Sequence, residues 1–199
     1  MAHPIRCRCG DLQGEVDTDA YATRAVCYCR DCRAYAYYLG PPEGMIDPLG
    51  GTEIIAVRPK HVRFTQGIDR LACMSLTAKG PFRWYAACCR TPIGNTPRNM
   101  KMAHVGLVGL ALCGDGHDLG ASFGPVRMRV YPESARGSPP RNAQFAYFAA
   151  LVGYLVSLLG SRITGSYRVN PFFNAATGAP RAEPIVLTAE QHQELMRAV

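Results

Sequence analysis

Hydrophobic and polar residues alternate over short distances in the first half of the chain. β-Branched and aromatic residues form four short runs, separated by Pro and Gly, at residues 52–57, 61–65, 71–77 and 82–85. Runs of this length, bounded by turn-forming residues, are typical of antiparallel strands. The apolar stretch 103–112 follows them and is predicted to pack on the sheet, either as a strand or as a short helix. The pattern predicts a mainly β fold.

The alternating pattern then gives way to a different composition. Residues 132–140 are rich in Pro and Ser and are typical of a linker or a long loop. Near the end of the chain, Thr188 and Gln191 have the spacing of a capping box, which predicts a short final helix. We therefore expect an antiparallel β domain over residues 1–132 and a loop-rich, partly helical extension over residues 133–199.

Residues 142–160 predict one long apolar helix in this extension. It begins at Asn142, a residue type suited to an N-cap, and ends at Gly160, a natural C-terminal stop. From Ala143 to Leu159 it would extend about 25 Å, less than the roughly 30 Å core of a bilayer. Because the helix is apolar on nearly every side, one sheet face would not cover it. Burial on the β domain or in the seam of a homodimer is therefore favoured, with a membrane span as the alternative.

Composition and charge narrow the class of protein. The chain has 199 residues, of which 48% are hydrophobic and 19% charged, so collagen-like, coiled-coil and wholly disordered chains are excluded. The formal net charge is +7, yet no run reaches five like charges, and nucleic acid is therefore not an expected partner. The first residues lack the apolar core and cleavage site of a secretory signal, which predicts a cytoplasmic, reducing environment.

Nine cysteines are the unusual part of the composition. In a reducing environment we do not expect disulfides. Seven of the cysteines form three closely spaced groups, namely Cys7 and Cys9, then Cys27, Cys29 and Cys32, then Cys88 and Cys89. Cys73 and Cys113 stand alone, and a lone cysteine is most often a small buried hydrophobe.

The middle group places three thiols within six residues. In an extended segment residues i and i+2 point to one face, so Cys27 and Cys29 can present their sulfurs side by side. Cys29 and Cys32 have Cys-x-x-Cys spacing, which suits a turn around one cation. Thiolates favour zinc, with four in a structural site or three and an exchangeable position in a catalytic one. We therefore predict one or two bound Zn²⁺; a redox pair at Cys29 and Cys32, or burial without metal, is the alternative.

Three blocks of the sequence resemble those of one known family. They are Cys7-Arg8-Cys9-Gly10, Cys27-Tyr28-Cys29-Arg30-Asp31-Cys32-Arg33 and Cys89-Arg90-Thr91-Pro92. They are similar to the C-x-C-G, C-H-C-x-D-C-R and C-x-x-C-G-T-P blocks of the glutathione-dependent formaldehyde-activating enzyme and centromere protein V family. Their order and spacing match over about residues 5–97. The resemblance implies a mostly antiparallel β fold with a structural zinc held by the outer blocks and a more accessible zinc in the middle block, near a thiol substrate.

The outer blocks match the family with one departure. By position, Cys7, Cys9 and Cys89 resemble ligands of the structural zinc, whereas the remaining expected cysteine falls on Ala86. Cys88 is the nearest substitute, although neighbouring cysteines seldom bind one metal without strain in the peptide between them. Either the loop is shifted so that one or both of Cys88 and Cys89 bind, or the site is three-coordinate, weak or empty.

The middle block is complete and resembles the ligands of the open zinc site, Cys27, Cys29 and Cys32. The family's usual His is replaced here by Tyr28. Arg33 is expected to bind an anionic thiol such as glutathione, the alternative being a surface arginine without such a role. In the last block Arg90 replaces a Gly, which predicts an altered backbone at that turn.

Two functions stay open. The first is an enzyme similar to carbon-sulfur lyases that act on glutathione-aldehyde adducts, in which a thiol substrate binds a three-cysteine zinc and no side-chain nucleophile is required. The second is a non-catalytic, zinc-stabilised scaffold or binding module. The changes at Tyr28 and Ala86, together with the long apolar helix, favour the second.

Overall fold

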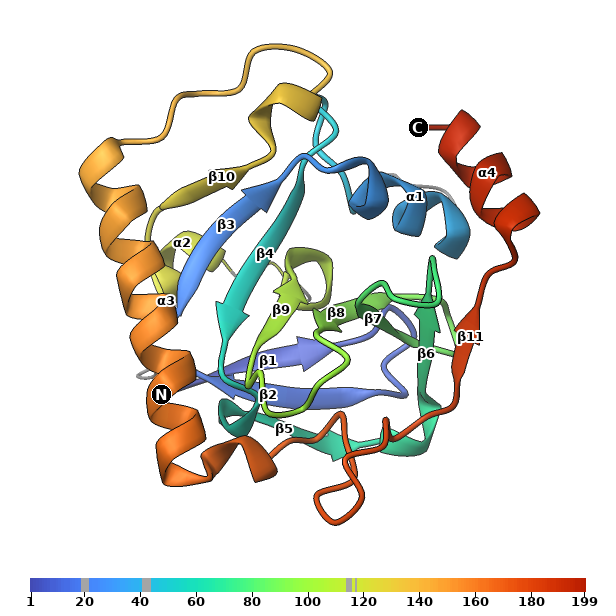
Figure 1. Cartoon of the computed structure of the whole chain (residues 1–199), viewed down its shortest axis with the longest axis vertical. Helices are drawn as coiled ribbons and strands as arrows, with labels where there is room; N and C mark the ends of the chain where they lie inside the picture. Colours follow the sequence, from blue (N-terminus) through green and yellow to red (C-terminus); the bar gives the residue numbers. More distant parts are fainter. Residues whose placement is uncertain (19–21, 41–43, 114–115, 117) are drawn as a thin grey trace.

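Short strands in two sheets form the framework of the fold (Figure 1). The computed structural model describes residues 1–18, 22–40, 44–113, 116 and 118–199. The strands are β1 (Ala2–Arg6), β2 (Gln13–Asp17), β3 (Thr23–Cys27), β4 (Thr52–Val57), β5 (Val62–Gln66), β6 (Leu71–Ser75), β7 (Phe82–Ala86), β8 (Pro92–Thr96), β9 (Val105–Val108), β10 (Met128–Val130) and β11 (Pro184–Val186). One sheet has the order β1-β2-β5, and the other has the order β10-β3-β4-β9-β8-β7-β6-β11.

The alternating runs become strands as predicted. β4 occupies the whole run 52–57, the bounds of β5 and β7 lie within one residue of their runs, and β6 ends two residues before the end of the run 71–77. Neighbouring strands pair antiparallel, except that the two edge strands of the large sheet, β10 and β11, pair parallel with β3 and β6. The stretch 103–112, which the pattern left open, contains β9 followed by a 3-10 turn. The prediction of a mainly β fold with C-terminal helices is confirmed.

Four α-helices accompany the sheets in the described part of the chain: α1 (Arg30–Leu39), α2 (Leu119–Phe123), α3 (Gln144–Thr164) and α4 (Ala189–Arg197). Single 3-10 turns are η1 (Pro59–His61), η2 (Ile68–Arg70), η3 (Gly109–Ala111), η5 (Pro132–Ser134) and η6 (Ser166–Arg168). The predicted capping box at Thr188 and Gln191 opens α4. The long helix continues past Gly160 and ends at Gly165, whose left-handed φ of 72° gives the C-cap.

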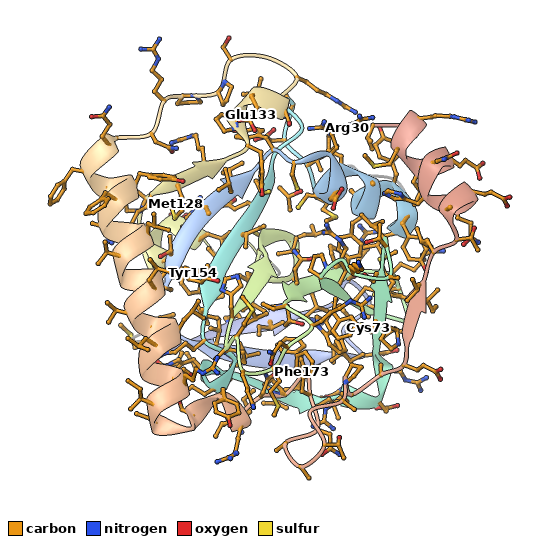
Figure 2. The ribbon with its side chains drawn as sticks, in the orientation of Figure 1. Arg30, Cys73, Met128, Glu133, Tyr154 and Phe173 are labelled. Carbon is orange, nitrogen blue, oxygen red and sulfur yellow. The ribbon has the colours of Figure 1, made fainter. Side chains whose placement is uncertain are left out.

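The C-terminal third of the chain completes the main core. Phe172 and Phe173 are fully buried and pack on Trp84 of β7, with ring centroids 5.3 Å and 6.1 Å apart. The Trp84 indole N–H donates to the Thr96 hydroxyl at 2.9 Å, which satisfies the one polar atom of that side chain. Residues 133–199 therefore share a core with the β domain, and Figure 2 shows Phe173 among its side chains.

Helix α3 lies along the outside of the large sheet (Figure 1). Only Ala150 and Ser161 of its residues are buried. The prediction that the β domain buries this helix is wrong, because only one narrow strip of it, including Tyr154, meets the sheet (Figure 2). Among the described residues, α3 is the one helix that is long and apolar enough to cross a membrane, judged by length and composition alone.

A histidine lies in the contact between α3 and the sheet. The ring of His104 meets that of Tyr154 edge-on, with centroids 5.0 Å apart. Burial lowers the pKa of His104 to about 4, whereas the unfolded chain keeps a value of about 6.5. The folded state therefore binds a proton at His104 more weakly than the unfolded state does. As the pH falls from about 6.5 through about 4, protonation of the unfolded state lowers the free energy of unfolding. We expect a loss of up to about 3 kcal/mol of unfolding free energy from this residue.

Urea unfolding at pH 7 and pH 4.5 checks this expectation. The difference in stability between the two pH values should shrink in His104→Phe. His192→Phe, on α4, is the matched control. Its difference in stability between pH 7 and pH 4.5 should equal that of the unmodified protein. Equal pH dependence in both variants would contradict the assignment to His104.

Candidate metal centres

Four cysteines from two distant parts of the chain meet at one point. Cys7 and Cys9 lie in the turn after β1, and Cys88 and Cys89 lie in the turn between β7 and β8. The four Sγ atoms all lie within 4.8 Å of one another. The Sγ of Cys7 is 3.5 Å from that of Cys9 and 3.8 Å from that of Cys88, and the Sγ atoms of Cys9 and Cys88 are 3.2 Å apart. This four-cysteine group is positioned to hold a metal ion.

The turn between β7 and β8 brings two neighbouring cysteines to the same point. The Sγ atoms of Cys88 and Cys89 are 3.9 Å apart. Arg90 follows with a φ of 57°, the left-handed region that glycine favours, and its N–H donates to the Ala86 carbonyl at 2.7 Å. Ala86 is buried in β7 and offers no ligand atom. Of the alternatives left open by the sequence, the geometry matches the one in which both cysteines join the group.

Hydrogen bonds tie the two cysteine turns together. The Arg8 N–H donates to the Thr91 hydroxyl at 2.9 Å, and this hydroxyl lies 3.1 Å from the Sγ of Cys89. Burial raises the pKa of Cys89, but hydrogen bonds from Thr91 and from the Cys9 backbone together outweigh burial, so that the pKa is lowered to about 6. The thiolate is the form that binds metal, so one ligand of the group is largely ionised at neutral pH.

The first turn rests closely on Gly67. In that turn the Leu12 N–H donates to the Sγ of Cys7 at 3.3 Å. Gly67 has a φ of 66°, and a Cβ placed there would lie 1.9 Å from the Asp11 carbonyl oxygen. The substitution Gly67→Ala therefore strains the backbone and displaces this turn, and we expect it to lower the unfolding free energy by at least about 2 kcal/mol.

Thermal or urea unfolding of the metal-loaded protein measures this effect. Gly160→Ala is the control, because a Cβ at Gly160 meets nothing within 4 Å. Within a helix that change should stabilise the protein by about 0.5–1 kcal/mol. If Gly67→Ala unfolds no more easily than the control, the close contact with Asp11 does not constrain the turn.

The other three cysteines form a second group where β3 leads into α1. Cys27 ends β3, Cys29 is the N-cap of α1, and Cys32 lies in the first turn of that helix. The Cys32 N–H donates to the Sγ of Cys29 at 3.4 Å, and the Sγ atoms of Cys27 and Cys29 are 3.3 Å apart. All three Sγ atoms lie within 4.8 Å of one another, and within the described ranges no fourth Cys, His, Asp or Glu joins them. This three-cysteine group is also positioned to hold a metal ion.

A buried arginine lies beside the three-cysteine group. The Arg83 side chain, on β7, is 3% exposed, and its Nη1 is 3.9 Å from the Sγ of Cys32 and 3.2 Å from Oδ1 of Asn95. Its guanidinium lies over the Tyr35 ring, 5.2 Å from the centroid. Hydrogen bonds from Cys27 and Cys29 lower the pKa of Cys32 most, and the charge of Arg83 lowers it further against the effect of burial. Cys32 is therefore the thiol of this group that ionises most easily.

Arg33, the residue predicted to bind an anionic thiol, is buried as well. Its Nη1 donates to the carbonyl oxygens of Tyr28 at 2.8 Å and Ser134 at 2.9 Å. Arg33 thus joins the turn before α1 to η5 and is not a surface arginine, and its role toward a thiol stays a prediction. Sequence reasoning missed Arg83, although an arginine inside the apolar strand β7 was a usable signal, because a buried charge needs a partner.

The two lone cysteines differ from each other. Cys73 is 1% exposed and lies in the main core, as predicted. Cys113 is exposed, so the prediction of a buried position is wrong for it. Leu112, directly before it, is the last buried residue of the preceding apolar run.

Comparison with known proteins identifies a family without assigning a function. No curated protein matches the chain. A crystal structure of a Rhodobacter sphaeroides protein aligns with 64% of this chain and 99% of that chain, at 18% identity and a TM-score of 0.41. The model of one family, described as a family of unknown function (DUF6151), matches residues 1–184. Because that match spans most of the sequence, the chain belongs to the DUF6151 family.

Proposed function

We propose that the protein binds two zinc ions and that a small thiol such as glutathione binds at the three-cysteine group. In this proposal the chain is a divergent relative of the glutathione-dependent formaldehyde-activating enzymes, similar to carbon-sulfur lyases that act on thiol-aldehyde adducts. One observation carries it: the thiols of Cys27, Cys29 and Cys32 converge, and no fourth ligand of the usual kinds joins them in the part of the chain that the structure describes.

The donor set supports zinc. Thiolates are soft ligands, whereas magnesium and calcium prefer oxygen. With Zn–S bonds of about 2.3 Å, the sulfurs of a tetrahedral site lie about 3.8 Å apart. In the four-cysteine group, four of the six sulfur pairs are separated by 3.2 to 3.9 Å, and all six lie within 4.8 Å. That group therefore fits a closed structural site, and the three-cysteine group fits a site with one exchangeable position.

The surroundings of the three-cysteine group suit a bound thiolate. A zinc ion there would supply Lewis acidity, which lowers the pKa of a thiol that it binds. Three thiolates and one Zn²⁺ carry a net charge of −1, and the Arg83 guanidinium, 3.9 Å from the Sγ of Cys32, offsets that charge in a buried place. The N-terminus of α1, capped by Cys29, also favours negative charge.

A non-catalytic zinc-stabilised scaffold is the second candidate. Two observations favour it: Tyr28 is 2% exposed where the family's block has His, and the Arg33 guanidinium is already bound to two carbonyl oxygens. Both side chains are thus held inside the protein, where the Arg33 Nε is buried without a hydrogen-bond partner. Both candidates require bound zinc, and they differ in whether a small thiol binds to the zinc at the three-cysteine group.

Metal content and a spectroscopic titration together test the proposal. Purified protein should hold two zinc ions per chain, Cys32→Ser should hold one with an unchanged circular dichroism spectrum, and the control Cys113→Ser should hold two. In protein loaded with Co²⁺, glutathione should change the visible absorption bands, and Cys32→Ser should abolish that change. Two tightly bound ions with no response to any small thiol would establish the scaffold; folded, unstripped protein without zinc would exclude both candidates.

A further inference from the structure

The outward side of α3 is its apolar side. Seven large apolar residues of the helix are exposed, from 41% for Val152 to 86% for Phe145. They are Phe145, Phe148, Val152, Leu155, Val156, Leu159 and Ile163. Spacings of three and four residues place them on one stripe along the helix. We call these seven residues the α3 stripe; Figure 1 shows no helix or strand of the described residues over this side of the helix.

The inward side of α3 carries small and polar residues. Ala150 and Ser161 are buried, and the Ser161 hydroxyl is 3.0 Å from that of Ser166. Tyr154, Ser157 and Leu158 line the contact with the sheet, so Leu158 is the one large aliphatic residue of α3 in that contact. A helix on the surface of a protein in water normally turns its apolar side inward. In α3 the orientation is reversed, so the stripe requires an apolar medium or partner.

The segments before and after the stripe in the sequence carry charges of one sign. Between Glu133 and Glu183 the sequence has no acidic residue and five arginines, Arg136, Arg141, Arg162, Arg168 and Arg181. Arg141 precedes α3 and Arg162 lies in its last turn. Just beyond its C-terminal end, Lys101 and Arg168 line a hollow of about 450 Å³ that has no acidic lining residue. An apolar stripe flanked by arginines complements a surface of apolar chains and phosphate groups.

We propose that α3 lies in the plane of a membrane that contains anionic phospholipid, with the α3 stripe among the acyl chains and the arginines at the phosphates. This inference is independent of the proposed zinc chemistry. The helix lies along the surface and does not cross it, because its inward side is attached to the sheet through Tyr154 and His104. Crossing would break that contact and expose Ser157 and Ser161 to lipid.

A second copy of the chain is a weaker candidate for the occupant. Pairing two α3 stripes would bring two arginine-rich segments together, and neither segment contains an acidic residue between Glu133 and Glu183 to offset the repulsion. Lipid phosphates offset the same charges without rearrangement of the protein. The charge pattern therefore favours the membrane over the homodimer seam that the sequence suggested.

Flotation of the full chain with vesicles tests the proposal. We expect binding to phosphatidylcholine vesicles that contain about one-third phosphatidylglycerol, and at least about tenfold weaker binding to phosphatidylcholine alone or in high salt. Leu155→Glu combined with Leu159→Glu should weaken binding to the anionic vesicles at least about tenfold. Ile185→Glu is the matched control, because Ile185 is an exposed apolar residue on β11, across the molecule from α3, and should leave binding unchanged.

A tryptophan reporter gives a second readout. The single tryptophan, Trp84, is fully buried, so its emission provides a constant background. In Phe148→Trp, emission should shift to shorter wavelength on addition of anionic vesicles. The proposal is overturned if the folded protein does not float with the anionic vesicles and the emission of Phe148→Trp does not shift. It is equally overturned if the protein elutes as a dimer that the double Glu variant converts to a monomer while vesicles bind neither form.

Discussion

Removal of metal from the four-cysteine group is expected to lower the free energy of unfolding by more than about 5 kcal/mol. The group joins the turn after β1, in the small sheet, to the turn between β7 and β8, in the large one. Without an ion, the hydrogen bond from the Arg8 N–H to the Thr91 hydroxyl still joins the two turns, but the four sulfurs lose their common anchor. For a chain of this size the melting temperature should fall by at least about 10 °C.

Calorimetry of the protein with and without a zinc chelator measures this loss, and a point variant locates it. Cys9 is exposed, so Cys9→Ser removes a ligand without opening a cavity in the core. Its melting temperature should approach that of the chelated protein, and chelator should lower it little further. Cys113→Ser, which changes an exposed thiol outside both groups, should melt like the unmodified protein. If Cys9→Ser melts with that control, the four-cysteine group does not stabilise the fold.

The second large effect is expected from Arg83→Ala, with a loss of about 3–5 kcal/mol of stability. The change leaves the Cys32 thiolate without its nearby cation and Asn95 without its donor, and it removes the guanidinium from the face of Tyr35. A cation 3.9 Å from a ligand sulfur also favours the ionised form that holds metal. The affinity of the three-cysteine group for zinc should therefore fall at least about tenfold.

Competition with a chromophoric chelator separates this electrostatic role from simple packing. Arg33→Ala is the matched variant, because Arg33 is also buried near α1 but donates to carbonyl oxygens. It should lower stability and leave zinc affinity nearly unchanged. Arg83→Lys keeps the charge and should recover part of the affinity. Equal affinities in the two alanine variants would show that Arg83 acts by packing alone.

The β-strands were predictable because their signal is local. In β4 the strand coincides with the β-branched run of the sequence, and the final helix was marked by two residues three apart, Thr188 and Gln191. Helix α1 gave no such signal. Its first turn belongs to the cysteine motif, and its tyrosines favour strand over helix when taken alone. Only the structure shows that Cys29 acts as an N-cap.

The metal groups were predictable in membership but not in assembly. Cysteine spacing indicated which residues are candidate ligands, whereas the meeting of Cys7 with Cys88 joins turns that lie 81 residues apart. The fate of Cys88 depended on the conformation at Arg90, which no spacing rule supplies. Arg83 was hidden for a similar reason, because its partner Cys32 comes from another element.

Both edges of the large sheet are closed by strands that arise late in the chain, β10 and β11. During synthesis, the ribosome therefore releases six strands of this sheet before either outer backbone edge has a partner, and before Phe172 and Phe173 can cover Trp84. The nascent protein therefore has an unpaired sheet edge, which favours aggregation, until β11 emerges. A chain that ends before β11 leaves the edge of β6 unpaired and is therefore prone to aggregate. The solubility of the protein thus depends on translation through β11.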